Sequence, residues 1–169
     1  MPHRYIIALS LSAMLAAAFP AAAQTTEVAL GGLRTDPDAP VQITADRLQA
    51  DQDAGTAVFT GDVVVVQGEM VMAAPRVEVF YAADGSGTLD RVHATGGVTL
   101  TSPGDAAEGE DAVYTPADTT VVMTGNVLLT QGTTTLAGQM LTADLSAGTG
   151  VMEGRVSMLI PAEAEAGQD

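Results

Sequence analysis

The chain has no cysteine, no lysine and no tryptophan, and it contains only three phenylalanines and three tyrosines. Without cysteine the protein can form no disulfide, iron–sulfur cluster, thiolate zinc site or cysteine nucleophile. Six arginines stand against 21 acidic residues, and the net charge of −15 excludes a role in binding nucleic acid. Hydrophobic residues nevertheless make up 47% of the sequence, so the protein is predicted to fold around an aliphatic core.

The first 23 residues have the features of a secretory signal peptide. His3 and Arg4 form a short positive region, residues 6–19 are an uncharged apolar run, and three alanines precede Gln24. A retained membrane anchor is the alternative, but this run is shorter than the roughly 20 residues that span a membrane, and Pro20 ends it. No cysteine follows the cleavage site, which excludes a lipoprotein. We expect cleavage near Ala23-Gln24 and export to the periplasm; 146 of the 169 residues then remain, the size of one domain.

From residue 41 onward, short runs of valine, threonine, leucine and methionine alternate with turn residues. Apolar residues recur at every second position, which predicts β-strands and no helix in the mature chain. Four similar segments begin at Gly61, Gly96, Gly125 and Gly154, at spacings of 35, 29 and 29 residues. A Gln-Gly pair follows the first and the third glycine, at 67–68 and 131–132. Each segment is therefore predicted to form an antiparallel strand-turn-strand unit.

Stacked β-units of this size predict an all-β fold, such as a β-repeat or a jelly roll, in which the units share one core. Side chains alternate between the two faces of a strand. This alternation predicts the following core-facing residues: Val63, Val65, Met70, Met72, Val77, Val79, Tyr81, Val98, Leu100, Val121, Met123, Val127, Leu129, Val156, Met158 and Ile160.

The two ends of the mature chain differ from its repetitive middle. Residues 24–40 carry two glycines and two prolines with little alternation, and residues 162–169 form a short acidic tail without aromatic residues. We expect the N-terminal segment to be flexible and the tail to be disordered. The folded β-domain is predicted to extend over residues 41–161.

Several short motifs resemble the OstA-like proteins of lipopolysaccharide transport. They are Val41-Gln42-Ile43-Thr44-Ala45-Asp46, the segment Phe59-Thr60-Gly61-Asp62-Val63 with Gln67-Gly68 behind it, and Thr124-Gly125-Asn126-Val127 followed by Gln131 and Leu136. They occur in the family's order, and the resemblance covers most of residues 41–160. It implies a twisted β-jelly roll of antiparallel strands, which holds the acyl chains of lipid A between two sheets.

The resemblance also implies partners. Family members stack end to end between an inner-membrane complex and an outer-membrane translocon, and a partner in each membrane carries an OstA-like domain. The inner-membrane relative keeps its N-terminal anchor and the outer-membrane relative continues into a long barrel. A cleavable signal and a short chain therefore favour the periplasmic bridge component, which binds lipopolysaccharide, associates head to tail and serves outer-membrane assembly.

Lipopolysaccharide needs a covered apolar path, because moving a chain of about a dozen methylenes into water costs on the order of 10 kcal/mol. Methionines add side chains that repack as one lipid replaces another. The residues predicted to contact acyl chains are Val41, Ile43, Val63, Val65, Met70, Met72, Val77, Val79, Tyr81, Val98, Leu100, Val121, Met123, Val127 and Leu129. Apolar alternation and scattered methionines are, however, also what an ordinary β core requires.

The first and last strands of the stack are predicted to pair with neighbouring molecules. The main-chain groups of an edge strand can extend a sheet across an interface. The predicted edges contain Val41 and Ile43 at one end, and Val156, Met158 and Ile160 at the other. The last strand can instead be an ordinary terminal strand that the acidic tail covers.

No motif points to an enzyme, a cofactor or a metal site. His93 is the only histidine of the mature chain, and no G-x-S-x-G motif surrounds Ser86. Asp51, Asp53 and Asp62 are spaced almost like the ligands of a calcium loop, but the position of the glycine and the last ligand do not match. The protein is therefore predicted not to be an enzyme.

The acidic charge bears on how lipid would be bound. The mature chain, with a charge of −16 after the loss of Arg4, should repel the phosphates of lipid A over a Debye length of about 8 Å. Affinity for the head group is therefore not the expected driving force. The alternative function is a structural β-repeat protein of the envelope, which binds other proteins and no lipid.

Overall fold

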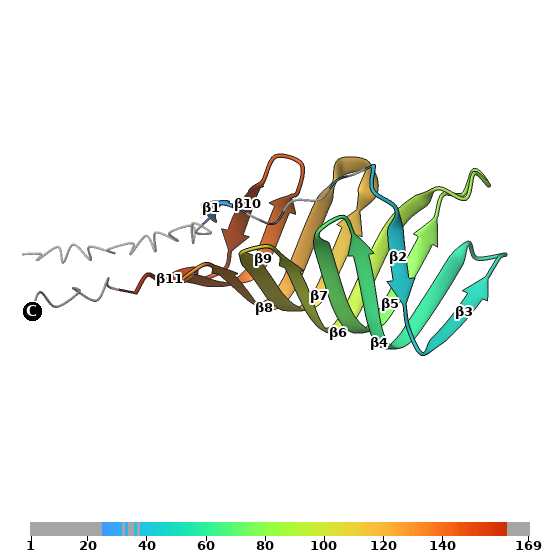
Figure 1. Ribbon diagram of the computed structural model, residues 1–169, viewed down its shortest axis with the longest axis horizontal. Coiled ribbons are helices and arrows are strands. Elements are labelled where there is room, and N and C mark those ends of the chain that lie inside the picture. The colour runs from blue at the N-terminus through green and yellow to red at the C-terminus, as the bar shows by residue number, and fades with distance from the viewer. Residues whose placement is uncertain (1–24, 32, 34–35, 37, 162–169) are drawn as a thin grey trace, which may run out of the picture.

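The computed structural model describes residues 25–31, 33, 36 and 38–161, so the predicted signal peptide and acidic tail lie outside the described residues. The described chain forms one antiparallel sheet, which confirms the all-β prediction (Figure 1). Its eleven strands are β1 (Thr25–Ala29), β2 (Val41–Thr44), β3 (Arg47–Asp51), β4 (Thr56–Gln67), β5 (Met70–Tyr81), β6 (Leu89–Ser102), β7 (Asp105–Thr115), β8 (Thr120–Gln131), β9 (Thr134–Asp144), β10 (Thr149–Glu153) and β11 (Ser157–Leu159). The one helical element in this part of the chain is a 3₁₀ turn, Pro116–Asp118.

Consecutive strands are neighbours along most of the sheet. The strand order is β1-β10-β9-β8-β7-β6-β5-β4-β2, so β4 to β10 form an antiparallel meander. β2 pairs with the second half of β4 and β3 with its first half. In the same way, β11 pairs with the first half of β9 and β10 pairs with its second half. The three predicted strand-turn-strand units that begin at Gly61, Gly96 and Gly125 are therefore present, whereas Gly154 is followed by the single strand β11 in the described chain. Each long strand contributes to two halves of the sheet: half 1 contains β2 and β11, and half 2 contains β1, β3 and β10.

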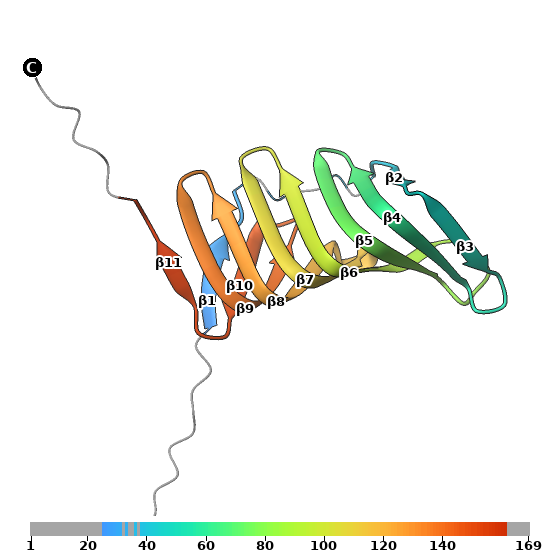
Figure 2. The ribbon, with the colours of Figure 1, turned by 90° about the horizontal axis from the view of Figure 1, so that it is seen from below.

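The long strands bend where the two halves meet (Figure 2). β4, β6 and β8 bend at two consecutive residues with positive φ, of which the first is Gly61, Gly96 or Gly125. At each bend these two residues face a single residue of the next strand, as in a β-bulge. Glycine is required here: at Gly125, φ is +82° and an added Cβ would lie 2.6 Å from the Glu110 side chain. The first three glycines of the repeat therefore mark bends in the middle of strands, and Gly154 lies between β10 and β11.

The bends fold the sheet so that its halves face each other across an aliphatic core. The alternation of buried and outward residues along β5 is interrupted at Pro75, since Ala74 and Val77 are both buried although they are three positions apart. This interruption keeps the same face of β5 inward on both sides of the bend. Across the interior, the Tyr114 hydroxyl in half 2 donates a hydrogen bond of 3.0 Å to Gln67 Oε1 in half 1. The two halves are thus in direct contact.

The prediction of a flexible segment at 24–40 is wrong for much of its length. β1 pairs with β10 at five positions, and the side chains of Leu30 and Leu33 are at most 1% exposed. Glycines, prolines and the lack of alternation suggested a loop, because only Val28 of β1 is buried and the two leucines enter the core singly. The folded part of the described chain therefore begins at Thr25, not at residue 41.

Candidate functional site

One cluster of buried side chains fills the space between the two halves. Twelve of the fifteen residues predicted to contact acyl chains belong to it, and none of the twelve is more than 4% exposed. They are Val63, Val65, Met70, Met72, Val77, Val79, Val98, Leu100, Val121, Met123, Val127 and Leu129. The structure confirms that these side chains face the core, while their contact with lipid stays a prediction.

Val41, Ile43 and Val156 are partly buried and pack against the edges of this cluster. They lie near opposite ends of the strand order, because β2 is the edge strand beside β4 and Val156 immediately precedes β11. The predicted edge residues Val41 and Ile43 therefore lie on one edge strand, and Val156, Met158 and Ile160 lie in or beside another. Pairing of these edges with other molecules stays a prediction.

Three residues predicted to face the core do not. Tyr81 is 42% exposed, because it ends β5 at a point where the pairing register with β6 shifts. Met158 and Ile160 are 52% and 67% exposed. The reason is that β11 is a short edge strand of three residues, which pairs with β9 alone. Alternation along a strand predicts which residues share a face, but it does not predict whether that face is covered.

Several core residues were missed by the sequence analysis. Leu136, Leu141 and Met152 in β9 and β10 are fully buried, and the alternation in β9 could have identified the first two. Leu30 and Leu33 belong to the same cluster, yet nothing periodic in the sequence marks them. The interior of the sheet is therefore lined by a segment from outside the repeats.

None of the buried side chains in the described part of the chain is charged, and Gln67 and Thr119 are the buried polar residues there. Burial raises the pKa of Tyr114, and its hydrogen bond to Gln67 partly offsets this rise. Such an interior suits an uncharged aliphatic ligand, because an ionised group would lose its hydration without gaining a partner.

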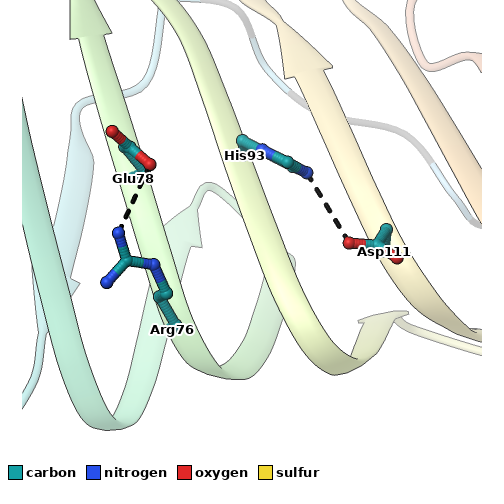
Figure 3. A network of polar contacts seen from close by, with 4 residues as sticks. All are labelled: Arg76, Glu78, His93 and Asp111. Atoms are coloured by element: carbon teal, nitrogen blue, oxygen red, sulfur yellow. Dashed lines mark hydrogen bonds and ion pairs between the residues drawn. The ribbon is translucent and has the colours of Figure 1, made fainter.

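Polar side chains lie on the opposite face of β5, β6 and β7 (Figure 3). Arg76 Nη2 is 3.5 Å from Glu78 Oε2, and His93 Nε2 is 3.7 Å from Asp111 Oδ1. Both pairs are partly exposed, so they are solvated surface contacts. Within residues 25–31, 33, 36 and 38–161 no three histidine or carboxylate side chains gather to hold a metal ion. The helical part of these residues is too short and too polar to cross a membrane.

Exposed apolar side chains gather at the two ends of the strand order. Met158, Leu159 and Ile160 are 52%, 69% and 67% exposed at the β11 end. At the other end Leu48 and Tyr81 are 57% and 42% exposed, and both line an open pocket of about 710 Å³. An exposed strand edge with apolar side chains is typical of a surface that contacts another protein or a ligand.

Residues 42–149 match the family described as "LptA/(LptD N-terminal domain) LPS transport protein". An uncharacterized protein of Rhizobium meliloti (strain 1021) is 32% identical over 148 residues, which cover 82% of this chain and 80% of that protein. The fold is similar to that of LptH from Pseudomonas aeruginosa, described as the LptA homologous periplasmic component of the conserved lipopolysaccharide transport device. The TM-score is 0.67 at 21% identity, over 76% of this chain and 99% of that one. The family match spans the bent sheet from β2 to the start of β10, and the chain belongs to the LptA and LptD N-terminal domain family of lipopolysaccharide transport proteins.

Proposed function

We propose that this protein is a periplasmic carrier that holds lipopolysaccharide by its acyl chains between the two halves of a twisted jelly-roll sheet. One observation carries this proposal: the aliphatic cluster continues through every strand pair from β4 to β10 and contains no charge among the described residues. Membership of a lipopolysaccharide transport family supports the same function. A binding site for an ordinary soluble metabolite would need several convergent polar groups, whereas Gln67 in the described interior is already hydrogen-bonded to Tyr114.

Burial of the acyl chains supplies the driving force. Each methylene removed from water contributes about 0.8 kcal/mol, so one chain of about a dozen methylenes gains on the order of 10 kcal/mol. Met70, Met72 and Met123 lie along the cluster, and their flexible side chains can repack around chains of different length. The acidic protein leaves the phosphorylated head group in solvent, outside the two halves.

The ends of the sheet provide the junctions of a bridge between the inner and outer membranes. β2 and β3 at one end, and β1 and β11 at the other, are the edge strands of the described chain. The apolar side chains that gather there would be covered when a second molecule adds its own edge strand. Copies of this chain, the anchored inner-membrane relative and the translocon of the outer membrane are the proposed neighbours.

Photo-crosslinking tests the proposed binding site. A photoreactive amino acid replaces one of three inward residues, Met72, Leu100 or Met123, in cells that make lipopolysaccharide. The matched controls are the next residues along each strand, which face outward and are only half-buried: Val71, Thr99 and Val122. Adducts with lipopolysaccharide should form at the inward positions and be scarce at the controls. Equal labelling of both sets would refute an acyl-chain site, and adducts with proteins alone would favour a structural envelope protein.

A further inference from the structure

The segment that joins β1 to β2 must run along the whole sheet, because these two strands lie at opposite ends of the strand order. Its described residues, 30, 31, 33, 36 and 38–40, are called the strap below. The strap contacts the turns of both halves on the side away from the bends. Leu30 N–H donates a hydrogen bond of 2.8 Å to Gly148 O in the turn between β9 and β10 of half 2. Leu33 N–H donates one of 3.3 Å to Asp105 Oδ2, at the start of β7 in half 1.

The two glutamines of the repeated Gln-Gly pairs hold the strap at its two ends. Gln131 Nε2 donates a hydrogen bond of 2.8 Å to Ala29 O, directly before the strap. Gln67 Nε2 donates one of 3.2 Å to Ala39 O, near its other end. Each glutamine is the last residue of a long strand, β4 or β8, and both strands end in half 1. The repeated motif therefore places one donor at each end of the strap.

The two leucines of the strap are part of the core between the halves. Leu30 and Leu33 are 1% and 0% exposed and belong to the cluster that forms the proposed acyl-chain site. A Cβ added at Gly150 would lie 3.1 Å from Leu30 Cδ1, so Leu30 packs directly against the inner face of β10. Because the twelve inward side chains are at most 4% exposed, a lipid cannot reach them until something moves.

We propose that the strap is a displaceable cover of the groove, whose leucines take the place of acyl chains when no lipid is bound. This inference rests on the proposed function. The strands of the sheet are joined by ladders, ten paired positions in the case of β4 and β5. The described residues of the strap belong to no strand and form no such ladder, so we expect the strap to open at lower cost than any strand pair between β4 and β9. Exchange of leucine side chains for lipid methylenes keeps the interior apolar throughout.

An engineered disulfide can lock the strap in place. The chain has no cysteine of its own, so the two introduced cysteines can pair only with each other. A Cβ added at Gly68, in the turn between β4 and β5, would lie 3.7 Å from Asp36 Cβ, within the range of disulfides. The test variant is Asp36→Cys combined with Gly68→Cys. Its reduced form carries the same substitutions and the same strain at Gly68, so it is the matched control. The single variants and the wild-type protein, with and without reductant, complete the set.

The assay measures binding of 11-(dansylamino)undecanoic acid by fluorescence, with circular dichroism to verify folding. Oxidation should raise the apparent Kd of the double variant at least about tenfold, because the open state is no longer populated, and reductant should restore it. Leu30→Ser combined with Leu33→Ser should bind the probe more tightly than the wild type. Equal binding by the oxidised and reduced forms would overturn the cover and leave the proposed function intact. Absence of binding in every variant, including the leucine variant, would overturn both.

Discussion

The bend in β9 permits a sharp prediction about packing, because Gly138 there has no room for a side chain. An alanine Cβ at this position would lie 2.7 Å from both Cγ and Sδ of Met152, and 3.0 Å from Glu153 O. Met152 is fully buried, so neither it nor the backbone of β10 can move freely. Overpacking of this kind costs about 1–3 kcal/mol, against roughly 0.5 kcal/mol gained from the stiffer unfolded chain. Gly138→Ala should therefore lower the free energy of unfolding by about 1.5 kcal/mol, and Tm by roughly 5 °C.

Thermal melting followed by circular dichroism measures this change. Gly31→Ala is the control, because the nearest atom to an added Cβ is 3.8 Å away and φ lies outside the left-handed region. It should leave Tm within about 1 °C of the wild type. The double variant Gly138→Ala with Met152→Val should lose less free energy of unfolding than the two single variants lose together, by at least about 0.5 kcal/mol. A Gly138→Ala variant that melts at or above the wild-type temperature would refute the close approach of β9 and β10.

Three further changes test the core, a turn and the edge. Leu100→Ala, at a fully buried position of β6, should lower the free energy of unfolding by about 2–5 kcal/mol in urea titration, and a loss below about 1 kcal/mol would contradict the packed interior. Hydrogen bonds from the backbone amide of Ala147 and, next in size, from the side chain of Ser146 lower the pKa of Asp144. The ionised carboxylate therefore stabilises the fold fully above the ordinary pKa of 3.8, and this stabilisation is lost as the pH falls through the lower pKa of the folded state. Asp144→Ala should therefore lower Tm at pH 7 and converge with the wild type in acid; a difference that does not vary with pH would refute this. Met158→Pro should weaken self-association in light scattering while the protein stays folded, because only the three residues of the edge strand β11 pair with β9 there, and unchanged oligomers of the folded variant would exclude β11 as a junction.

Alternation predicted the inner faces of the long strands because it is a local consequence of strand geometry. Met70 and Met72 are inward in one half of β5, and Val77 and Val79 are inward in the other, although the bend between them changes the phase. The two pairs lie in separate short stretches of sequence, each with its own alternation, so the change of phase between them does not affect the prediction. Family motifs added the proposed ligand, which no pattern of burial could supply.

Other features depend on contacts that are distant in sequence. Leu33 and its acceptor Asp105 are 72 residues apart, and Gln131 reaches Ala29 across 102 residues. A segment without periodicity gives no signal for such contacts, so the strap was predicted to be flexible. The exposure of Met158 is also not a local property, because it depends on β11 being an edge strand that pairs with β9 alone.

Native mass spectrometry of the protein isolated gently from the periplasm tests the central claim most directly. The proposed function predicts a population of molecules whose added mass equals that of the cell's own lipopolysaccharide or lipid A, and whose lipid is lost when the protein is unfolded. A folded protein that carries no lipid, and that takes up none when purified lipopolysaccharide is added, would contradict the claim.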